Sequence, residues 1–171
     1  MGEEQKEEER VIAPTTEDDL LLALGKMTAN FAMLEFHVAT GIWFLIGGLP
    51  RTGPIVTAGL SFKQLVNIFH ALMLEKSGSK PDVVETVGGF RGALFNAEEQ
   101  RNKLTHSIWP AGPEDRSTRI KDSIARGEWK LSIEKHSAEQ ISGLALEFEA
   151  LALEIFHFAF LQTIRPDAKG S

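Results

Sequence analysis

Apolar positions along the chain follow a helical period in four long segments. The first begins near Thr16, an N-cap candidate followed by three acidic residues that suit the positive end of a helix dipole, and it runs to Gly47-Gly48. Apolar residues occupy nearly all faces of this helix, which predicts partners on more than one side. Gly25 and Gly41 within it indicate positions where another helix approaches closely.

A turn and a capping signal separate the first helix from the second. The segment GGLPRTGP contains three glycines and two prolines, so we expect a loop there with Arg51 exposed on it. Ser61 and Gln64 have the spacing of a capping box, and apolar residues continue at helical period to about Lys76. The second helix is therefore expected from Ser61 to about Lys76.

The third helix is expected to begin at Pro81, because proline suits the first helical turn. Its apolar positions continue to about Trp109, where Pro110 ends the pattern. Between residues 113 and 136 apolar and polar residues alternate around the sequence Ala-Arg-Gly-Glu at 125–128. That alternation predicts a small β-hairpin.

The last helix opens with a second capping box, at Ser137 and Gln140, and its apolar positions reach about Ile164. Four helices with a small β-hairpin insertion between the third and the fourth predict an all-α fold. There is no internal repeat and no interdomain linker. The expected organisation is a disordered acidic tail at 1–15, a single helical domain at 16–165 and a short tail at 166–171.

Composition narrows the classes of function. The chain is 43% hydrophobic and 25% charged, enough apolar content for a core, and its formal net charge is −6. Such a charge argues against a broad basic face, so any RNA contact must be local. The absence of cysteine excludes disulfides, thiolate metal sites and a cysteine nucleophile, and it suits a cytoplasmic location.

The most apolar stretch, Ala29 to Leu49, is long enough to cross a membrane. It contains Asn30, Glu35 and His37 and lacks basic flanks, so we interpret it as a buried helix and expect no membrane partner. The two ionisable groups in it are interpreted as satisfied within the fold. No His-Glu-x-x-His spacing occurs, so neither a metal site nor a cofactor is expected.

Polar side chains gather on one face of the expected third helix. At about 100° per residue, Arg101, Thr105, Glu98, Asn102 and His106 fall within about 140° of one another. Two aromatic residues lie in the same arc, which suits a dimer interface or a cleft that stacks on bases. They are Trp109 and Phe95.

The residue types of this arc suit chemistry on a phosphodiester. An arginine binds phosphate and stabilises added negative charge, and a histidine transfers a proton near neutral pH. RNA carries its own nucleophile, the 2′-hydroxyl, so its cleavage requires proton transfer, alignment and charge stabilisation but no metal.

The hexapeptide Arg-Asn-Lys-Leu-Thr-His at 101–106, followed by Ser-Ile-Trp, resembles the signature of HEPN-domain proteins: an arginine, a polar residue, a short spacer and a histidine. The resemblance is close over about six residues and loose over most of the chain. It implies an antiparallel up-and-down four-helix bundle with the motif late in the third helix. The hairpin insertion after the tryptophan departs from the family's pattern.

The resemblance also implies an activity. In that family two motifs of a homodimer commonly meet to form one metal-independent ribonuclease site, which implies Arg101 and His106 as catalytic residues and Asn102 and Thr105 as substrate-binding residues. RNA, a second copy and an antitoxin or other partner protein are the implied partners, in prokaryotic defence or a toxin-antitoxin system.

Two alternatives stay open. Some HEPN-like domains are noncatalytic modules for dimerisation or for binding a nucleotide or partner. In the second alternative, the polar arc is a solvated helix end in which Arg101 forms an ion pair with Glu98. Such a pair stabilises a helix by about 0.2 to 0.5 kcal/mol.

Overall fold

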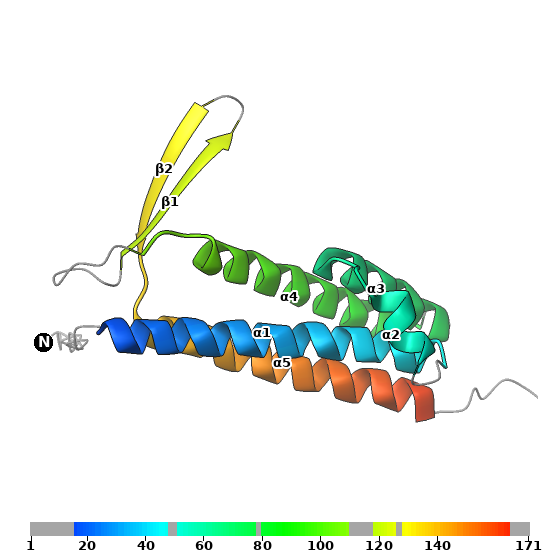
Figure 1. Cartoon of the computed structure of the whole chain (residues 1–171). Helices are drawn as coiled ribbons and strands as arrows, with labels where there is room; N and C mark the ends of the chain where they lie inside the picture. Colours follow the sequence, from blue (N-terminus) through cyan, green and yellow to red (C-terminus); the bar gives the residue numbers. More distant parts are fainter. Residues whose placement is uncertain (1–15, 48–50, 78–79, 110–117, 126–127, 165–171) are drawn as a thin grey trace, which may run out of the picture.

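A computed structural model describes residues 16–47, 51–77, 80–109, 118–125 and 128–164 of the 171-residue chain. The tails expected at 1–15 and 166–171 lie outside the described residues, as does Pro110. The described part is mostly helical with one small antiparallel sheet (Figure 1), which confirms the all-α class with a hairpin before the last helix. The elements are α1 (Glu17–Leu45), α2 (Thr52–Thr57), α3 (Phe62–Ser77), α4 (Pro81–Thr105), β1 (Thr118–Ala125), β2 (Glu128–Lys135) and α5 (Ala138–Ile164).

Capping boxes start three of the long helices at the positions expected from the sequence. Thr16, Ser61 and Ser137 each accept a hydrogen bond from the backbone N–H three residues further on, at 3.2, 3.4 and 3.1 Å. The side chain of that later residue accepts a hydrogen bond from the cap residue's own N–H in return. The fourth long helix, α4, begins at Pro81 as expected. Local sequence thus determines where these helices begin.

Helices α1 and α5 lie side by side and run in the same direction. The Asn30 side chain donates a hydrogen bond to the carbonyl of Ala145 at 2.8 Å, and His37 Nδ1 lies 3.1 Å from the carbonyl of Ala152. Both pairs are separated by 115 residues, as parallel helices require. The expectation that His37 is satisfied within the fold is confirmed.

The directions of the long helices differ from the expected up-and-down order. Phe62, at the start of α3, stacks against Phe31 in the middle of α1, with ring centroids 4.9 Å apart, and Phe69 packs further along, at Gly41. Helix α3 therefore also runs parallel to α1, while α4 runs back across it and places Arg101 over Phe31. Three long helices point one way and only α4 points the other.

Helix α2 explains this difference. The segment expected to be a plain loop contains a six-residue helix, in which Gly53 packs so closely on the Trp43 ring that no side chain fits. The Trp43 Nε1–H donates to the hydroxyl of Thr57 at 2.9 Å. These contacts return the chain along the end of α1, so α3 starts beside the middle of α1. Arg51 is exposed, as expected.

Two glycines of α1 have the roles that close packing and helix termination require. A Cβ on Gly41 would lie 2.7 Å from the Phe69 ring and 3.3 Å from Ala159, which confirms the close approach expected there. Gly47, with φ of +62°, follows the helix end in the left-handed conformation. The close approach expected at Gly25 is wrong, because no described atom lies within 4 Å of a Cβ built there.

Helix α4 ends earlier than expected, at Thr105 and not near Trp109. The chain instead forms a β-bridge, in which Ile108 and Ile120 exchange backbone hydrogen bonds of 2.9 Å in both directions. Ile108 is 62% exposed. Pairing with β1 thus competes successfully with the last helical turn.

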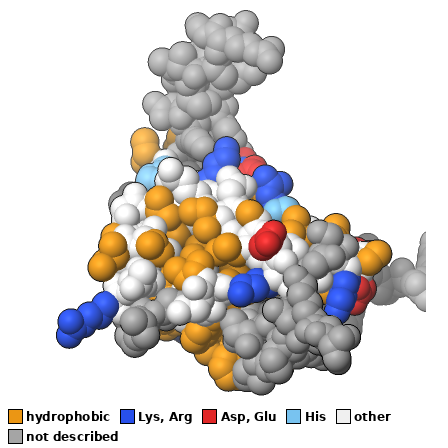
Figure 2. All heavy atoms as spheres, turned by 90° about the vertical axis from the view of Figure 1, so that its right-hand side faces the viewer, with side chains coloured by type: hydrophobic (Ala, Val, Ile, Leu, Met, Phe, Trp, Pro, Cys, Tyr) orange, Lys and Arg blue, Asp and Glu red, His pale blue; other side chains and the backbone are white. Residues whose placement is uncertain are grey.

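The end of the molecule at α2 is apolar. Figure 2 shows hydrophobic side chains gathered over the middle of this end face. Ile55 and Val56 of α2 and Ile46 after α1 are among the exposed large hydrophobic residues. In the parts of the chain that the structure describes, no helix combines the length and apolarity that crossing a membrane requires.

Candidate functional site

The hexapeptide 101–106 occupies the end of α4, next to the middle of α1. Arg101 is half-buried, and its guanidinium carbon lies 4.4 Å from the centroid of the Phe31 ring. Phe31 is itself fixed by aromatic contacts with α3 and α5. A guanidinium over a buried ring is held by a cation–π interaction, so Arg101 has a defined orientation.

The charge of Arg101 is not neutralised within the described part of the chain. No carboxylate among those residues forms an ion pair with it, and its buried Nε atom has no hydrogen-bond partner there. The pair with Glu98, which the solvated-helix alternative requires, does not form. Lys103 and Glu99 form the i,i+4 ion pair of this turn instead, at 2.8 Å. Arg101 is therefore a half-buried cation available to an anion.

Asn102 points to a different place from Arg101. It lies at an open hollow of about 360 Å³ on α4, where Phe95 supplies an apolar surface. The rest of the lining is charged, from Glu98, Glu99 and Lys103. The hollow therefore offers an amide and an aromatic face together with two carboxylates.

Thr105 and His106 are both exposed at the end of the helix. The Thr105 hydroxyl donates to the carbonyl of Arg101 at 2.8 Å, a bond within the helix. His106 is the C-cap residue, and its backbone N–H donates to the carbonyl of Asn102 at 3.2 Å. Its imidazole forms no hydrogen bond with any described residue, so the ring is open to solvent or to a partner.

A single chain does not bring the expected site residues together. No hydrogen bond or ring contact joins the side chains of Arg101 and His106, and neither residue lines the hollow beside Asn102. Arg101 packs toward α1, whereas His106 lies at the exposed cap. A site that uses both residues requires a bound substrate or a second molecule to bridge them.

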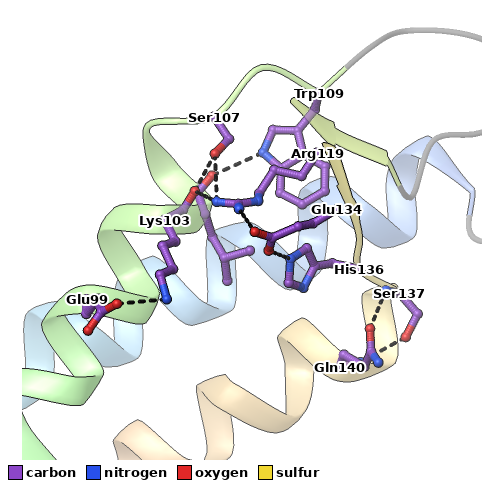
Figure 3. A network of polar contacts seen from close by, with 10 residues as sticks. Glu99, Lys103, Ser107, Trp109, Arg119, Glu134, His136, Ser137 and Gln140 are labelled. Carbon is purple, nitrogen blue, oxygen red and sulfur yellow. Dashed lines mark hydrogen bonds and ion pairs between the residues drawn. The ribbon is translucent and has the colours of Figure 1, made fainter. Parts of the chain in front are cut away.

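The hairpin holds the end of α4 through a buried arginine that the sequence did not single out (Figure 3). Arg119 of β1 is 2% exposed and donates hydrogen bonds to the carbonyl of Lys103 at 2.8 Å and to Ser107 Oγ at 3.3 Å. Its other Nη atom forms an ion pair with Glu134 of β2 at 2.7 Å. A cation at the carboxyl end of a helix complements the helix dipole.

Further polar contacts surround the same turn at the end of α4. The Trp109 Nε1–H donates to the carbonyl of Leu104 at 3.1 Å, and the Ser107 hydroxyl donates to the carbonyl of Lys103. On the other side of the network, His136 Nε2 lies 3.2 Å from the carboxylate of Glu134 (Figure 3). Carbonyls that the last turn of α4 leaves unpaired are thus satisfied by groups after the helix.

The missed residues left only weak signals in the sequence. Phe31 looks like any core position of an apolar helix, and Arg119 stands in an alternating strand where a charged residue is usually exposed. The need of the last helical carbonyls for partners was a usable signal. It does not specify which distant residue supplies them.

The described residues contain no group of three or more His, Asp or Glu side chains close enough to hold a metal ion. Comparison with protein-family models, with curated proteins and with solved structures found no match to this chain.

Proposed function

We propose that the chain is a metal-independent endoribonuclease of the HEPN type that acts as a homodimer with its site at the interface between two copies. The observation that supports this most is the state of Arg101. It is half-buried, held over the Phe31 ring and not neutralised by any described carboxylate, and it lies five residues before the exposed His106.

The proposed reaction is an internal transesterification. The 2′-oxygen of the RNA attacks the phosphorus, the bond from phosphorus to the 5′-oxygen breaks, and the products carry a 2′,3′-cyclic phosphate and a 5′-hydroxyl. His106 takes the proton of the 2′-hydroxyl and gives a proton to the leaving 5′-oxygen, and Arg101 stabilises the charge that develops on the phosphoryl oxygens. Asn102 and Thr105 hold the neighbouring nucleotide.

A second copy completes this site. Within the described part of one chain no hydrogen bond or ring contact joins Arg101 and His106, and His106 lies at the exposed end of α4. Packing the ends of two α4 helices together brings the arginine of one copy toward the histidine of the other. Because the chain carries a net charge of −6, the RNA is held by these few contacts and not by a wide basic surface.

The test is cleavage of a labelled single-stranded RNA in excess chelator, with product ends analysed. We expect cyclic phosphate ends from the wild type and a loss of at least about 100-fold in rate for Arg101→Ala and for His106→Ala. Arg91→Ala is the matched control, since Arg91 also lies on α4 and stacks on an aromatic ring, Phe95, at 4.8 Å. Rates unchanged in both motif variants, with folding intact, contradict the proposal.

The second candidate is a noncatalytic module that binds a partner protein through the same end of α4. The hollow favours it, because the Glu98 carboxylate beside Asn102 repels a phosphate backbone and suits a cationic side chain. Absence of cleavage by the wild type, together with an intact fold, favours this module.

A setting in prokaryotic defence or a toxin-antitoxin system, with a cognate antitoxin, is proposed on the resemblance alone.

A further inference from the structure

Helices α1 and α5 carry an apolar surface that no described part of the chain covers. Seven large hydrophobic side chains that share one side of the two helices are between 42% and 66% exposed. We call this set the α1–α5 face. Its members are Leu22, Met33 and Phe36 of α1 and Leu146, Leu153, Phe160 and Leu161 of α5.

The α1–α5 face points away from the interior on both helices. Phe31 and Phe148 face the interior and touch each other, with ring centroids 5.7 Å apart. At about 100° per residue, Met33 lies about 160° around α1 from Phe31, and Leu146 lies about 160° around α5 from Phe148. Because the two helices are parallel neighbours, both exposed stripes look the same way.

This face is separate from the end of α4. Arg101 lies over Phe31, so α4 covers the opposite side of α1 from Met33. Figure 1 shows α3 and α4 together on one side of the layer formed by α1 and α5. A contact through the α1–α5 face therefore leaves the hexapeptide 101–106 uncovered.

The exposed residues of α5 have the spacing of a helix-pairing seam. Leu146, Ala150, Leu153, His157 and Phe160 are all exposed and follow one another at intervals of four, three, four and three. This is the a/d spacing of a coiled coil, in which side chains of one helix insert between those of a like seam. A second copy of this chain provides such a seam.

The area of the face agrees with a dimer contact. Large side chains that are about half-exposed present on the order of 80 to 100 Å² each, so seven of them amount to about 600 Å² per copy. Stable interfaces bury about 800 Å² per partner, and the largest apolar patch of an ordinary monomer is about 300 to 600 Å². The seven side chains thus supply about three quarters of the area that one partner of a stable interface buries, at the upper end of the range for a monomer's largest apolar patch.

We propose that the α1–α5 face binds the same face of a second copy, with α5 packed against α5 of the partner molecule. This contact is independent of the proposed ribonuclease activity. It is distinct from the contact proposed between the ends of α4, so molecules that use both contacts form an assembly larger than a dimer.

The test is the mass of the full chain in solution, measured by sedimentation velocity over a range of concentrations. We expect the measured mass of the wild type to be at least twice the chain mass of 18.9 kDa. The double variant Leu146→Ser with Leu153→Ser should halve that mass or raise the dissociation constant by about 100-fold or more. Both side chains are exposed, so the fold, checked by circular dichroism, should be retained.

Ile133→Ser is the matched control, because Ile133 is 61% exposed and lies on β2, outside the α1–α5 face. It should leave the mass unchanged. A wild type that is monomeric at about 100 μM overturns the proposal. A double variant that keeps the mass of the wild type also overturns it, and so does an Ile133→Ser variant whose mass falls as much as that of the double variant. For a double variant that loses its fold, Leu153→Ala alone replaces it, and an unchanged dissociation constant then overturns the proposal. Loss or retention of RNA cleavage has no bearing on these outcomes.

Discussion

Replacing Arg119 with methionine tests how strongly the hairpin holds the end of α4. Methionine has a similar length and is flexible and apolar, so it fills the site without a charge. The substitution removes the two hydrogen bonds to Lys103 and Ser107 and the ion pair with Glu134. It leaves the Lys103 carbonyl with the hydrogen bond from the Ser107 hydroxyl.

The contacts set the size of the effect. Hydrogen bonds from a charged donor contribute about 1.5 to 3 kcal/mol each, although the one at 3.3 Å is at the weak end. The ion pair adds about 1 kcal/mol or less, since the Glu134 side chain is 48% exposed. Against these terms, burying the arginine charge costs several kcal/mol that methionine does not incur. We expect a net loss of about 2 kcal/mol in the free energy of unfolding.

Urea unfolding measures this loss and separates the contribution of the ion pair from that of the hydrogen bonds. It is applied to the wild type, Arg119→Met, Glu134→Gln and the double variant. We expect Glu134→Gln to cost about 1 kcal/mol in the wild type and less in Arg119→Met, because the ion pair with Arg119 is then absent while the contact with His136 is kept. The slope of the unfolding free energy against urea concentration should be the same in all four proteins.

The reasoning is refuted by a loss below about 0.5 kcal/mol in Arg119→Met, which is the range of an ordinary surface substitution. Equal costs of Glu134→Gln in both backgrounds refute the ion pair alone. In that case the hydrogen bonds to α4 account for the whole effect.

Two further predictions concern local packing and capping, and the same unfolding assay checks them. Gly41→Ala should destabilise by about 1 to 3 kcal/mol, because its Cβ would meet the Phe69 ring at 2.7 Å, whereas Gly88→Ala, with open space around it in α4, should stabilise by about 0.5 to 1 kcal/mol. Equal effects at the two glycines contradict the packing argument. Thr16→Ala should cost about 1 kcal/mol by removing the capping box of α1, and an unchanged stability contradicts that role.

The elements that the sequence predicted well are those fixed by neighbouring residues. The starts of α1, α3 and α5 follow from capping boxes, and that of α4 from Pro81. The hairpin follows from its alternation, and Ala125 and Glu128, on either side of its expected centre, pair with each other. Interactions over three or four residues are visible in the sequence, and tertiary packing did not change them.

The directions of the helices could not be predicted in this way. They depend on α2, whose six residues include Gly53 and Pro54 and so look like a turn. What makes this segment a helix that folds back on α1 is the fit of Gly53 to the Trp43 ring and the hydrogen bond from that ring to Thr57. Both are contacts between segments about ten residues apart, so neither has a local signature.

The position of His106 depends on the same kind of nonlocal contact. A helix continuing to Trp109 would fix His106 about 140° around α4 from Arg101. The helix ends at Thr105 instead, because Arg119 and Trp109 bind its last carbonyls and Ile108 pairs with Ile120. His106 then has non-helical backbone angles, φ −99° and ψ 25°. The hairpin therefore sets the backbone geometry of the histidine on which the proposed chemistry depends.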